Sequence, residues 1–71
     1  MAENKRQLKQ ALADKNITVS QFSDIINGDL NMSYQTVARY CRQTERTQLD
    51  FLSEYRWKLI DIRLEQLGVD W

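Results

Sequence analysis

Apolar residues recur at the three- and four-residue spacing of helices in four successive stretches of this chain. Capping and turn residues between the stretches predict helices at about residues 2–15, 18–27, 33–43 and 47–67. The pattern therefore predicts an all-α fold, a small four-helix domain. Residues 1–46 form its first part and residues 47–71 carry one long C-terminal helix, within a single domain.

The first predicted helix has an apolar side and a basic side. Its inner stripe consists of Leu8, Ala11, Leu12 and the stem of Lys15. Asn16 can end the helix, because asparagine tolerates the left-handed conformation found there. Lys5 and Lys9 lie on the other faces. That basic side is either a contact for DNA phosphates or a solvated charged surface.

The second helix has clear signals at both ends. Thr18 and Gln21 have the spacing of a capping box, and Gly28 can take the positive φ that stops a helix. Leu30 is predicted to point into the core from the following turn, and Asn31 suits a positive φ. The buried stripe is predicted to be Val19, Phe22, Ile25 and Ile26.

The third helix separates core residues from polar ones more sharply. Ser33 is a good N-cap, and Met32 and Val37 have the spacing of a hydrophobic staple around it. The inner seam is predicted to be Val37, Tyr40 and Cys41. The other faces carry an aromatic ring, an amide and two guanidinium groups, from Tyr34, Gln35, Arg39 and Arg42. Amide and guanidinium groups can make paired hydrogen bonds to base edges in a DNA major groove.

This third stretch also resembles a known family. The run Ser33-Tyr34-Gln35-Thr36-Val37, followed by Arg39, resembles the recognition helix of the lac repressor family, whose DNA-reading headpiece is a helix-turn-helix. The resemblance implies that residues 1–46 form a helix-turn-helix region. It also implies base contacts by Tyr34, Gln35 and Arg39, and phosphate contacts by Ser33 and Thr36. Arg42, Lys5 and Lys9 are expected to add backbone contacts.

The chain departs from that family before the recognition helix. Four more residues lie between Thr18 and Ser33 than in the tight version of the family. Asn27 and Gly28 stand where the family has an uninterrupted helix. The angle between the second and third helices is therefore expected to be the point of difference.

The fourth helix has more apolar residues than one buried face needs. A surface helix hides a stripe of roughly 100°, and here the apolar residues cover a wider arc. One predicted stripe consists of Leu49, Leu52, Tyr55 or the stem of Arg56, Leu59 and Ile60. It is widened by Phe51, Trp57, Leu64 and Leu67, whereas Ile62 lies to the side and Gly68 ends the helix. The surplus predicts a homodimer, with an interface formed by Phe51, Tyr55, Trp57, Leu64 and Leu67. The open alternative is that the first three helices cover this surface.

Composition limits the chemistry that the chain can perform. With 71 residues, one cysteine and no histidine, it can form no internal disulfide, and a zinc site or an activated nucleophile is not expected. No catalytic residue, metal, cofactor or small-molecule substrate is predicted. A helix that crosses a membrane is not expected either, because no apolar run approaches ~20 residues. The predicted location is the cytoplasm.

The net charge of zero hides an uneven distribution. Residues 1–16 carry four basic and two acidic side chains, and residues 33–46 carry three basic and one acidic, so each segment has a net charge of +2. Residues 17–32 and 47–71 each have a net charge of −2. Positive charge thus collects on the first and third helices, which weakly favours a DNA-binding face there.

Two functions follow from these observations. The first is a small sequence-specific transcriptional regulator of phage, plasmid or bacterial type. As a dimer it would place two third helices about one turn of double-stranded DNA apart, ~34 Å. The second is an adaptor or inhibitor that binds a protein partner through the apolar face of the last helix and does not touch DNA.

Overall fold

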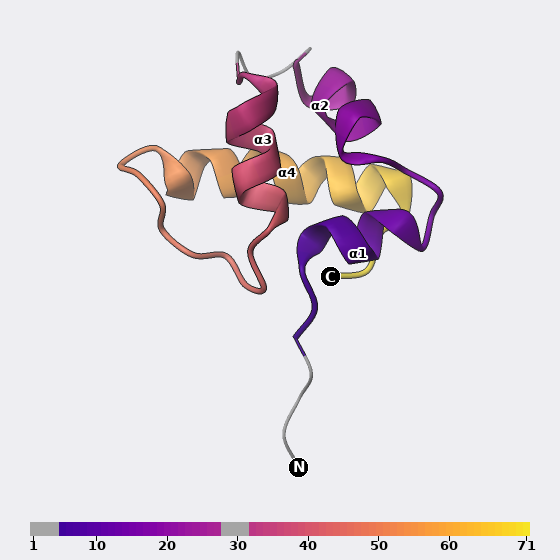
Figure 1. Ribbon diagram of the computed structural model, residues 1–71. Coiled ribbons are helices and arrows are strands. Elements are labelled where there is room, and N and C mark those ends of the chain that lie inside the picture. Colours follow the sequence, from indigo (N-terminus) through magenta and orange to yellow (C-terminus); the bar gives the residue numbers. More distant parts are fainter. Residues whose placement is uncertain (1–4, 28–31) are drawn as a thin grey trace.

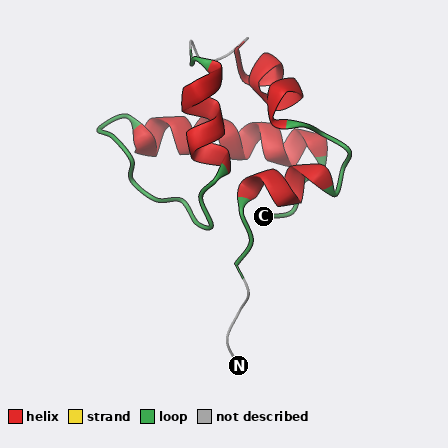
Figure 2. Ribbon diagram, in the orientation of Figure 1, coloured by secondary structure: helices red, strands yellow, loops and turns green. Residues whose placement is uncertain are grey.

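The protein is a small all-helical domain in the part that its computed structural model describes, residues 5–27 and 32–71. That part forms four helices and no strand (Figure 1; Figure 2). They are α1 Leu8–Ala13, α2 Val19–Asn27, α3 Tyr34–Cys41 and α4 Ser53–Leu67. The predicted four-helix architecture is confirmed. The predicted turn residues Gly28, Leu30 and Asn31 lie outside the described residues.

Helix α4 is the base on which the other helices lie. Figure 1 shows it behind the other three, with α3 standing across it, α2 above it in this view, and α1 beside its C-terminal half. The end of the chain returns to the start of α1, where Trp71 Nε1 donates a hydrogen bond to the Arg6 carbonyl at 2.8 Å. All four helices therefore face one shared core.

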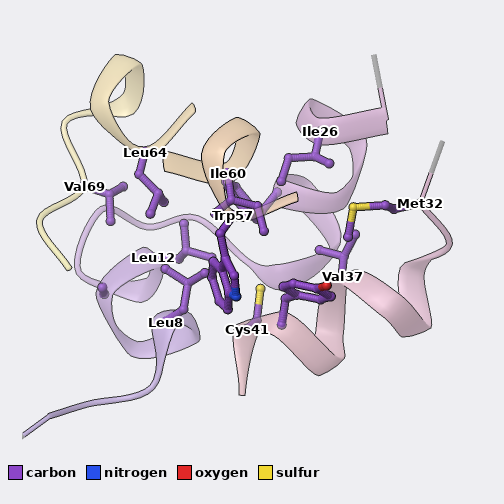
Figure 3. Close-up of a cluster of buried hydrophobic side chains, with 13 residues drawn as sticks. Leu8, Leu12, Ile26, Met32, Val37, Cys41, Trp57, Ile60, Leu64 and Val69 are labelled. Carbon is purple, nitrogen blue, oxygen red and sulfur yellow. The ribbon is translucent and has the colours of Figure 1, made fainter. Parts of the chain in front are cut away.

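That core is a single cluster of buried apolar side chains to which every helix contributes. Figure 3 shows Trp57 of α4 pointing into the middle of the cluster. The predicted inner residues of α1 and α3 are all in it, whereas Lys15 is exposed and its predicted packing is wrong. The members of the cluster are Leu8, Ala11, Leu12, Phe22, Ile26, Met32, Val37, Tyr40, Cys41, Trp57, Ile60, Leu64 and Val69.

Most of the predicted helix caps are confirmed. The Thr18 hydroxyl accepts from Gln21 N–H at 3.0 Å, and Thr18 N–H donates to Gln21 Oε1 at 2.9 Å, which is the reciprocal capping box. Asn16 has a φ of 59° after α1, and Gly68 has a φ of 72° after α4. Gly68 allows Val69 N–H to reach the Leu64 carbonyl at 2.8 Å, which closes the last turn.

The start of α1 was predicted too early. The helix begins at Leu8, whereas the pattern predicts a beginning near Ala2. Leu8 N–H donates to the Gln43 carbonyl at 3.0 Å, and the Gln7 side chain donates to the Arg42 carbonyl at 3.0 Å. Gln7 and Leu8 therefore supply hydrogen-bond donors to the carbonyls that follow α3. A contact between residues so far apart leaves no trace in local periodicity.

The start of α4 was also predicted too early, at Thr47 in place of Ser53. The Thr47 hydroxyl donates to the Glu45 carbonyl at 3.3 Å and does not cap a helix. The Ser53 hydroxyl accepts instead from Leu49 N–H at 2.7 Å and Asp50 N–H at 2.9 Å, which holds residues 47–52 as a loop. Trp57 Nε1 fastens the same loop by donating to the Thr47 carbonyl at 2.8 Å.

The buried face of α4 differs from the predicted stripe. Ser53, Trp57, Ile60 and Leu64 face the core at spacings of four, three and four residues. Tyr55 and Leu52, predicted in the inner stripe, are 58% and 40% exposed. Because apolar residues surround this helix, its periodicity could not decide which side would face the core.

A buried polar junction joins α3 to the start of α4. The fully buried Tyr40 hydroxyl lies 2.8 Å from Ser53 Oγ and donates to Asp50 Oδ2 at 3.1 Å. Arg56 Nη1 reaches the same carboxylate oxygen at 2.8 Å. The Tyr40 ring packs on Trp57 with a centroid distance of 4.9 Å. These contacts fix how α3 lies on α4.

We predict that Tyr40→Phe lowers the free energy of unfolding by about 1–2 kcal/mol, because a buried acceptor and hydroxyl lose their partner. Tyr34→Phe is the matched control: Tyr34 is 53% exposed, so its effect should stay within about 0.5 kcal/mol. Urea unfolding followed by tryptophan fluorescence measures both values. Equal effects of the two substitutions would contradict a stabilising role for the Tyr40 hydroxyl.

The same junction predicts a loss of stability in acid. Burial raises the pKa of Asp50, but hydrogen bonds from Leu52 N–H and the Tyr40 hydroxyl, with the charge of Arg56, leave that pKa below its ordinary value. Asp50 therefore stabilises the fold above its unfolded pKa of about 3.9, and this stabilisation disappears as pH falls through the lower folded pKa. The stability difference between the wild type and Asp50→Asn should be largest near neutral pH and should shrink below about pH 4. Urea midpoints measured across this range test the prediction, and a constant difference would contradict it.

Candidate nucleic-acid interface

The outward side of α3 is a polar ridge that no other helix covers. Its core residues Val37, Tyr40 and Cys41 are fully buried, which turns the opposite side of the helix to solvent. That opposite side carries Gln35, Arg39 and Arg42 at spacings of four and three residues, and all three are exposed. We call these three residues the α3 ridge.

Tyr34 flanks the ridge at the first turn of α3 and is 53% exposed. The structure thus brings the three predicted base-contacting residues, Tyr34, Gln35 and Arg39, to the free surface of one helix. Arg39 Nη2 makes a long hydrogen bond of 3.4 Å to the Leu49 carbonyl. This single contact holds the guanidinium group beside the loop and leaves most of its donors to the solvent.

The two predicted phosphate-binding hydroxyls already have a structural role. Ser33 Oγ accepts from Thr36 N–H at 3.3 Å and lies 3.0 Å from Thr36 Oγ1. Ser33 is therefore the N-cap of α3, as predicted. Ser33 is exposed and Thr36 is half-buried, so both stand at the edge of the ridge.

The N-terminal end of α1 lies against the C-terminal end of α3. The hydrogen bonds of Gln7 and Leu8 to the Arg42 and Gln43 carbonyls, just after α3, place the two ends side by side. Lys9 and Arg42 are both exposed there, and neither forms an ion pair within the described residues. The place where α1 meets the end of α3 thus carries two positive charges, Lys9 and Arg42, that no acidic side chain in the described part of the chain neutralises.

Lys5, the other predicted backbone contact from this end, does have an acidic partner. Its Nζ lies 2.8 Å from Glu45 Oε1. The hydrogen bond and the charge of Lys5 hold the pKa of Glu45 below its ordinary value. Lys5 therefore contributes less free positive charge to this surface than Lys9 and Arg42.

Ion pairs elsewhere explain how a neutral chain retains this positive region. Arg46 holds Asp61 through both carboxylate oxygens, and Arg56 holds Asp50. Arg6 likewise pairs with Asp14. No acidic residue occurs between Met32 and Thr44. Acidic side chains thus neutralise arginines away from the α3 ridge and leave the ridge itself uncompensated.

The predicted dimer residues do not form one surface. Trp57 and Leu64 are only 5% and 3% exposed, because they belong to the core of the chain itself, and Leu67 is packed against that core. A second copy cannot reach Trp57 or Leu64 without opening the fold. Phe51 and Tyr55, at 89% and 58% exposed, remain free.

Sequence reasoning missed the neighbours that complete this exposed surface. Leu52 and Ile62 are 40% and 51% exposed, and both lie on the same side of α4 as Tyr55. The signal was present in the sequence, since Leu52, Tyr55, Leu59 and Ile62 follow helical spacing. It was missed because the sequence pattern did not decide which side of α4 faces the core.

Residues 5–27 and 32–71 contain neither a metal-binding cluster nor a helix that could span a membrane. No group of three or more histidine, cysteine or acidic side chains in these ranges could hold a metal ion. No helix in them is long and apolar enough to cross a membrane. Comparison of the chain with protein-family models, curated proteins and solved structures gave no match. The proposed function below therefore rests on the exposed residues of the protein.

We predict that Cys41 is unreactive in the folded protein. Its side chain is fully buried, and burial raises the pKa of the thiol to about 12, although the nearby charge of Lys9 lowers it. The thiolate is the reactive form, and it is nearly absent at pH 8. A disulfide reagent such as Ellman's reagent should label the protein quickly in urea and only at the rate of unfolding without it. Labelling at the speed of a free thiol in the native protein would refute this assignment.

Proposed function

We propose that this protein is a small DNA-binding regulator of transcription and that α2 and α3 act as its helix-turn-helix. In this proposal α3 enters the major groove with its ridge toward the bases. Helix α4 supports it from behind, and the end of α1 lies over the adjacent phosphates. No catalytic step and no cofactor are part of the proposal.

One observation carries the proposal: the α3 ridge presents Gln35, Arg39 and Arg42 in line, with the exposed Tyr34 beside them. A major groove admits one α-helix, and amide and guanidinium side chains are the groups that pair with adenine and guanine edges. A ridge that served only to keep the protein soluble would have no need to exclude acidic residues. Here no acidic side chain interrupts it.

The surroundings of the ridge supply groups suited to the DNA backbone. Lys9 and Arg42 offer two uncompensated charges where α1 meets α3, and Lys5 could exchange Glu45 for a phosphate. Ser33 and Thr36 stand at the N-terminal end of the same helix. Contacts of this kind fix the position of a protein on a duplex and make its affinity dependent on salt.

The expected consequence is a separation of roles between ridge residues. Gln35→Ala and Arg39→Ala should each cost about 1–3 kcal/mol of discrimination at one base pair of a selected site. Arg42→Ala should instead weaken binding to all duplexes and reduce the log–log salt slope by about 0.9. Fluorescence anisotropy on a selected duplex and on random duplexes, at several salt concentrations, measures both quantities.

Lys15→Ala is the matched control, because Lys15 is exposed at the far end of α1 and has no ion pair among the described residues. It should leave both affinity and salt slope close to wild type. Equal losses on selected and random duplexes for the Gln35 and Arg39 variants would show that these residues do not read bases.

A protein-binding adaptor is the second candidate, favoured by the exposed apolar residues of α4. Phe51, Tyr55 and Ile62 are each more than half exposed. If the purified protein shows no measurable affinity for any duplex at low salt, the DNA proposal fails and the adaptor function stands alone.

A further inference from the structure

The outer side of α4 carries a continuous apolar stripe. Leu52, Tyr55 and Ile62 are 40%, 58% and 51% exposed. Leu59 lies between the last two; it is half-buried because part of its side chain packs against the core. Their spacing of three, four and three residues aligns them along one side of the helix. Phe51, 89% exposed, lies beside Leu52 in the turn just before α4. We call these five residues the α4 stripe.

The exposed area is large for a chain of this size. Taking about 200 Å² for an aromatic side chain, Phe51 and Tyr55 alone present about 300 Å² of their surface. Apolar patches of a few hundred Å² on small soluble proteins mark interaction sites. A standard interface buries about 800 Å² on each partner, with an apolar centre and a polar rim. The α4 stripe is large enough to form the apolar centre of such an interface.

The charges beside the stripe fit a second copy of the same helix. Lys58 and Glu65 lie along one edge, and neither has a partner among the described residues. When two copies of α4 run antiparallel with Leu59 against Ile62 of the other copy, each Lys58 meets the other copy's Glu65. On the opposite edge the same pairing brings Arg56 beside the other copy's Arg63. The charge of Arg56 is already compensated there by Asp50, at 2.8 Å.

We propose that the α4 stripe is the contact surface for a second copy of this chain, in a two-fold antiparallel pair. The interface between the two copies is self-complementary, because it has an apolar centre and two Lys58–Glu65 pairs along one edge. This surface replaces the predicted one, since Tyr55 and Phe51 belong to it while Trp57 and Leu64 lie in the core.

The geometry of α3 on α4 gives this dimer an unusual property. Tyr40 of α3 and Trp57 of α4 pack ring to ring, so the inner sides of these two helices face each other. The α3 ridge lies on the far side of α3, and the α4 stripe lies on the far side of α4. The two surfaces therefore point in opposite directions, in agreement with the view in which α3 stands in front of α4 (Figure 1).

A two-fold contact reverses the direction perpendicular to the interface, whichever way the helices run. Pairing through the α4 stripe consequently turns the two α3 ridges outward, on opposite sides of the dimer. With helices spaced about 8–10 Å apart, the two α3 axes lie roughly 25–30 Å from each other across it. Two ridges in this arrangement cannot enter successive grooves on one side of a straight duplex.

The inference for DNA rests on the proposed function. A dimer with outward ridges holds two separate duplexes, or two distant segments of one duplex, and bridges them. The partner class is thus double-stranded DNA on both faces, with the second copy of this chain as the joint.

Two measurements test the surface itself. Sedimentation velocity of the wild type over micromolar concentrations should show a monomer–dimer equilibrium. Tyr55→Ser with Ile62→Ser should raise the dissociation constant roughly 30-fold or more. Because both residues are exposed, the double variant should keep the wild-type circular dichroism. Its urea midpoint should equal that of the wild type diluted below the dissociation constant of the dimer, where the partner no longer adds stability. A monomeric wild type, or an unchanged dimer in a folded double variant, would overturn the surface.

A charge exchange tests the antiparallel pairing. Lys58→Glu should weaken the dimer by opposing two carboxylates, and adding Glu65→Lys should restore the affinity, since neither side chain has another partner to lose. Loss of affinity without restoration in the double exchange would overturn the antiparallel register.

Bridging is measured by capturing a fluorescent duplex on beads that carry a second, unlabelled duplex. The wild type should capture it, and Tyr55→Ser with Ile62→Ser should reduce capture to background while still binding one free duplex in anisotropy. A dimer that binds duplex but captures none overturns bridging and leaves DNA binding intact. A dimer that binds no duplex at all refutes the proposed function and leaves the surface standing.

Discussion

The position of Tyr40 is the constraint on which the rest of this structure depends. Its ring packs on Trp57 of α4, and its buried hydroxyl contacts Ser53 and Asp50 at the point where α4 begins. An unpaired hydroxyl at this depth would cost the fold a large part of its stability. The start of α4 is therefore coupled to the seating of α3, and one residue sets both the order of the loop before α4 and the direction of the α3 ridge.

Trp57 links this junction to the loop before α4 and to the C-terminal residue Trp71. Its indole N–H holds the Thr47 carbonyl, and its ring stacks on Trp71 at a centroid distance of 5.4 Å. Trp71 in turn lies under the Arg46 guanidinium, 4.7 Å from the ring centroid, and donates to the Arg6 carbonyl. A row of aromatic rings thus joins α3, α4 and the start of α1. In a chain too short for a large core, such a row fastens segments that apolar burial alone would leave loose.

Local signals in the sequence predicted those parts of the fold that local contacts determine. The Thr18–Gln21 capping box, the Ser33 cap and the left-handed Asn16 and Gly68 all depend on neighbours within a few residues. The exposed side of α3 was predicted for the same reason, because its core seam is unambiguous. The late starts of α1 and α4 were not predicted, because the Gln43 carbonyl and the Trp57 indole act across long sequence separations. The prediction of the buried face of α4 was wrong for a third reason. Apolar residues lie on both sides of this helix, and the side that is buried is the one whose Trp57 packs on Tyr40, a residue of another helix.

That selection also connects the two proposed surfaces. Because Trp57 packs on Tyr40, with Ile60 and Leu64 on the same buried side of α4, the helical spacing leaves Leu52, Tyr55 and Ile62 outside. The contact between Tyr40 and Trp57 also fixes the inner side of α3, so the α3 ridge on the opposite side of that helix faces outward. A polar ridge and an apolar stripe on opposite sides of one small domain are therefore a single geometric outcome. A domain built in this way keeps the surface proposed for nucleic acid apart from the surface proposed for a second copy, so that both can be occupied at once.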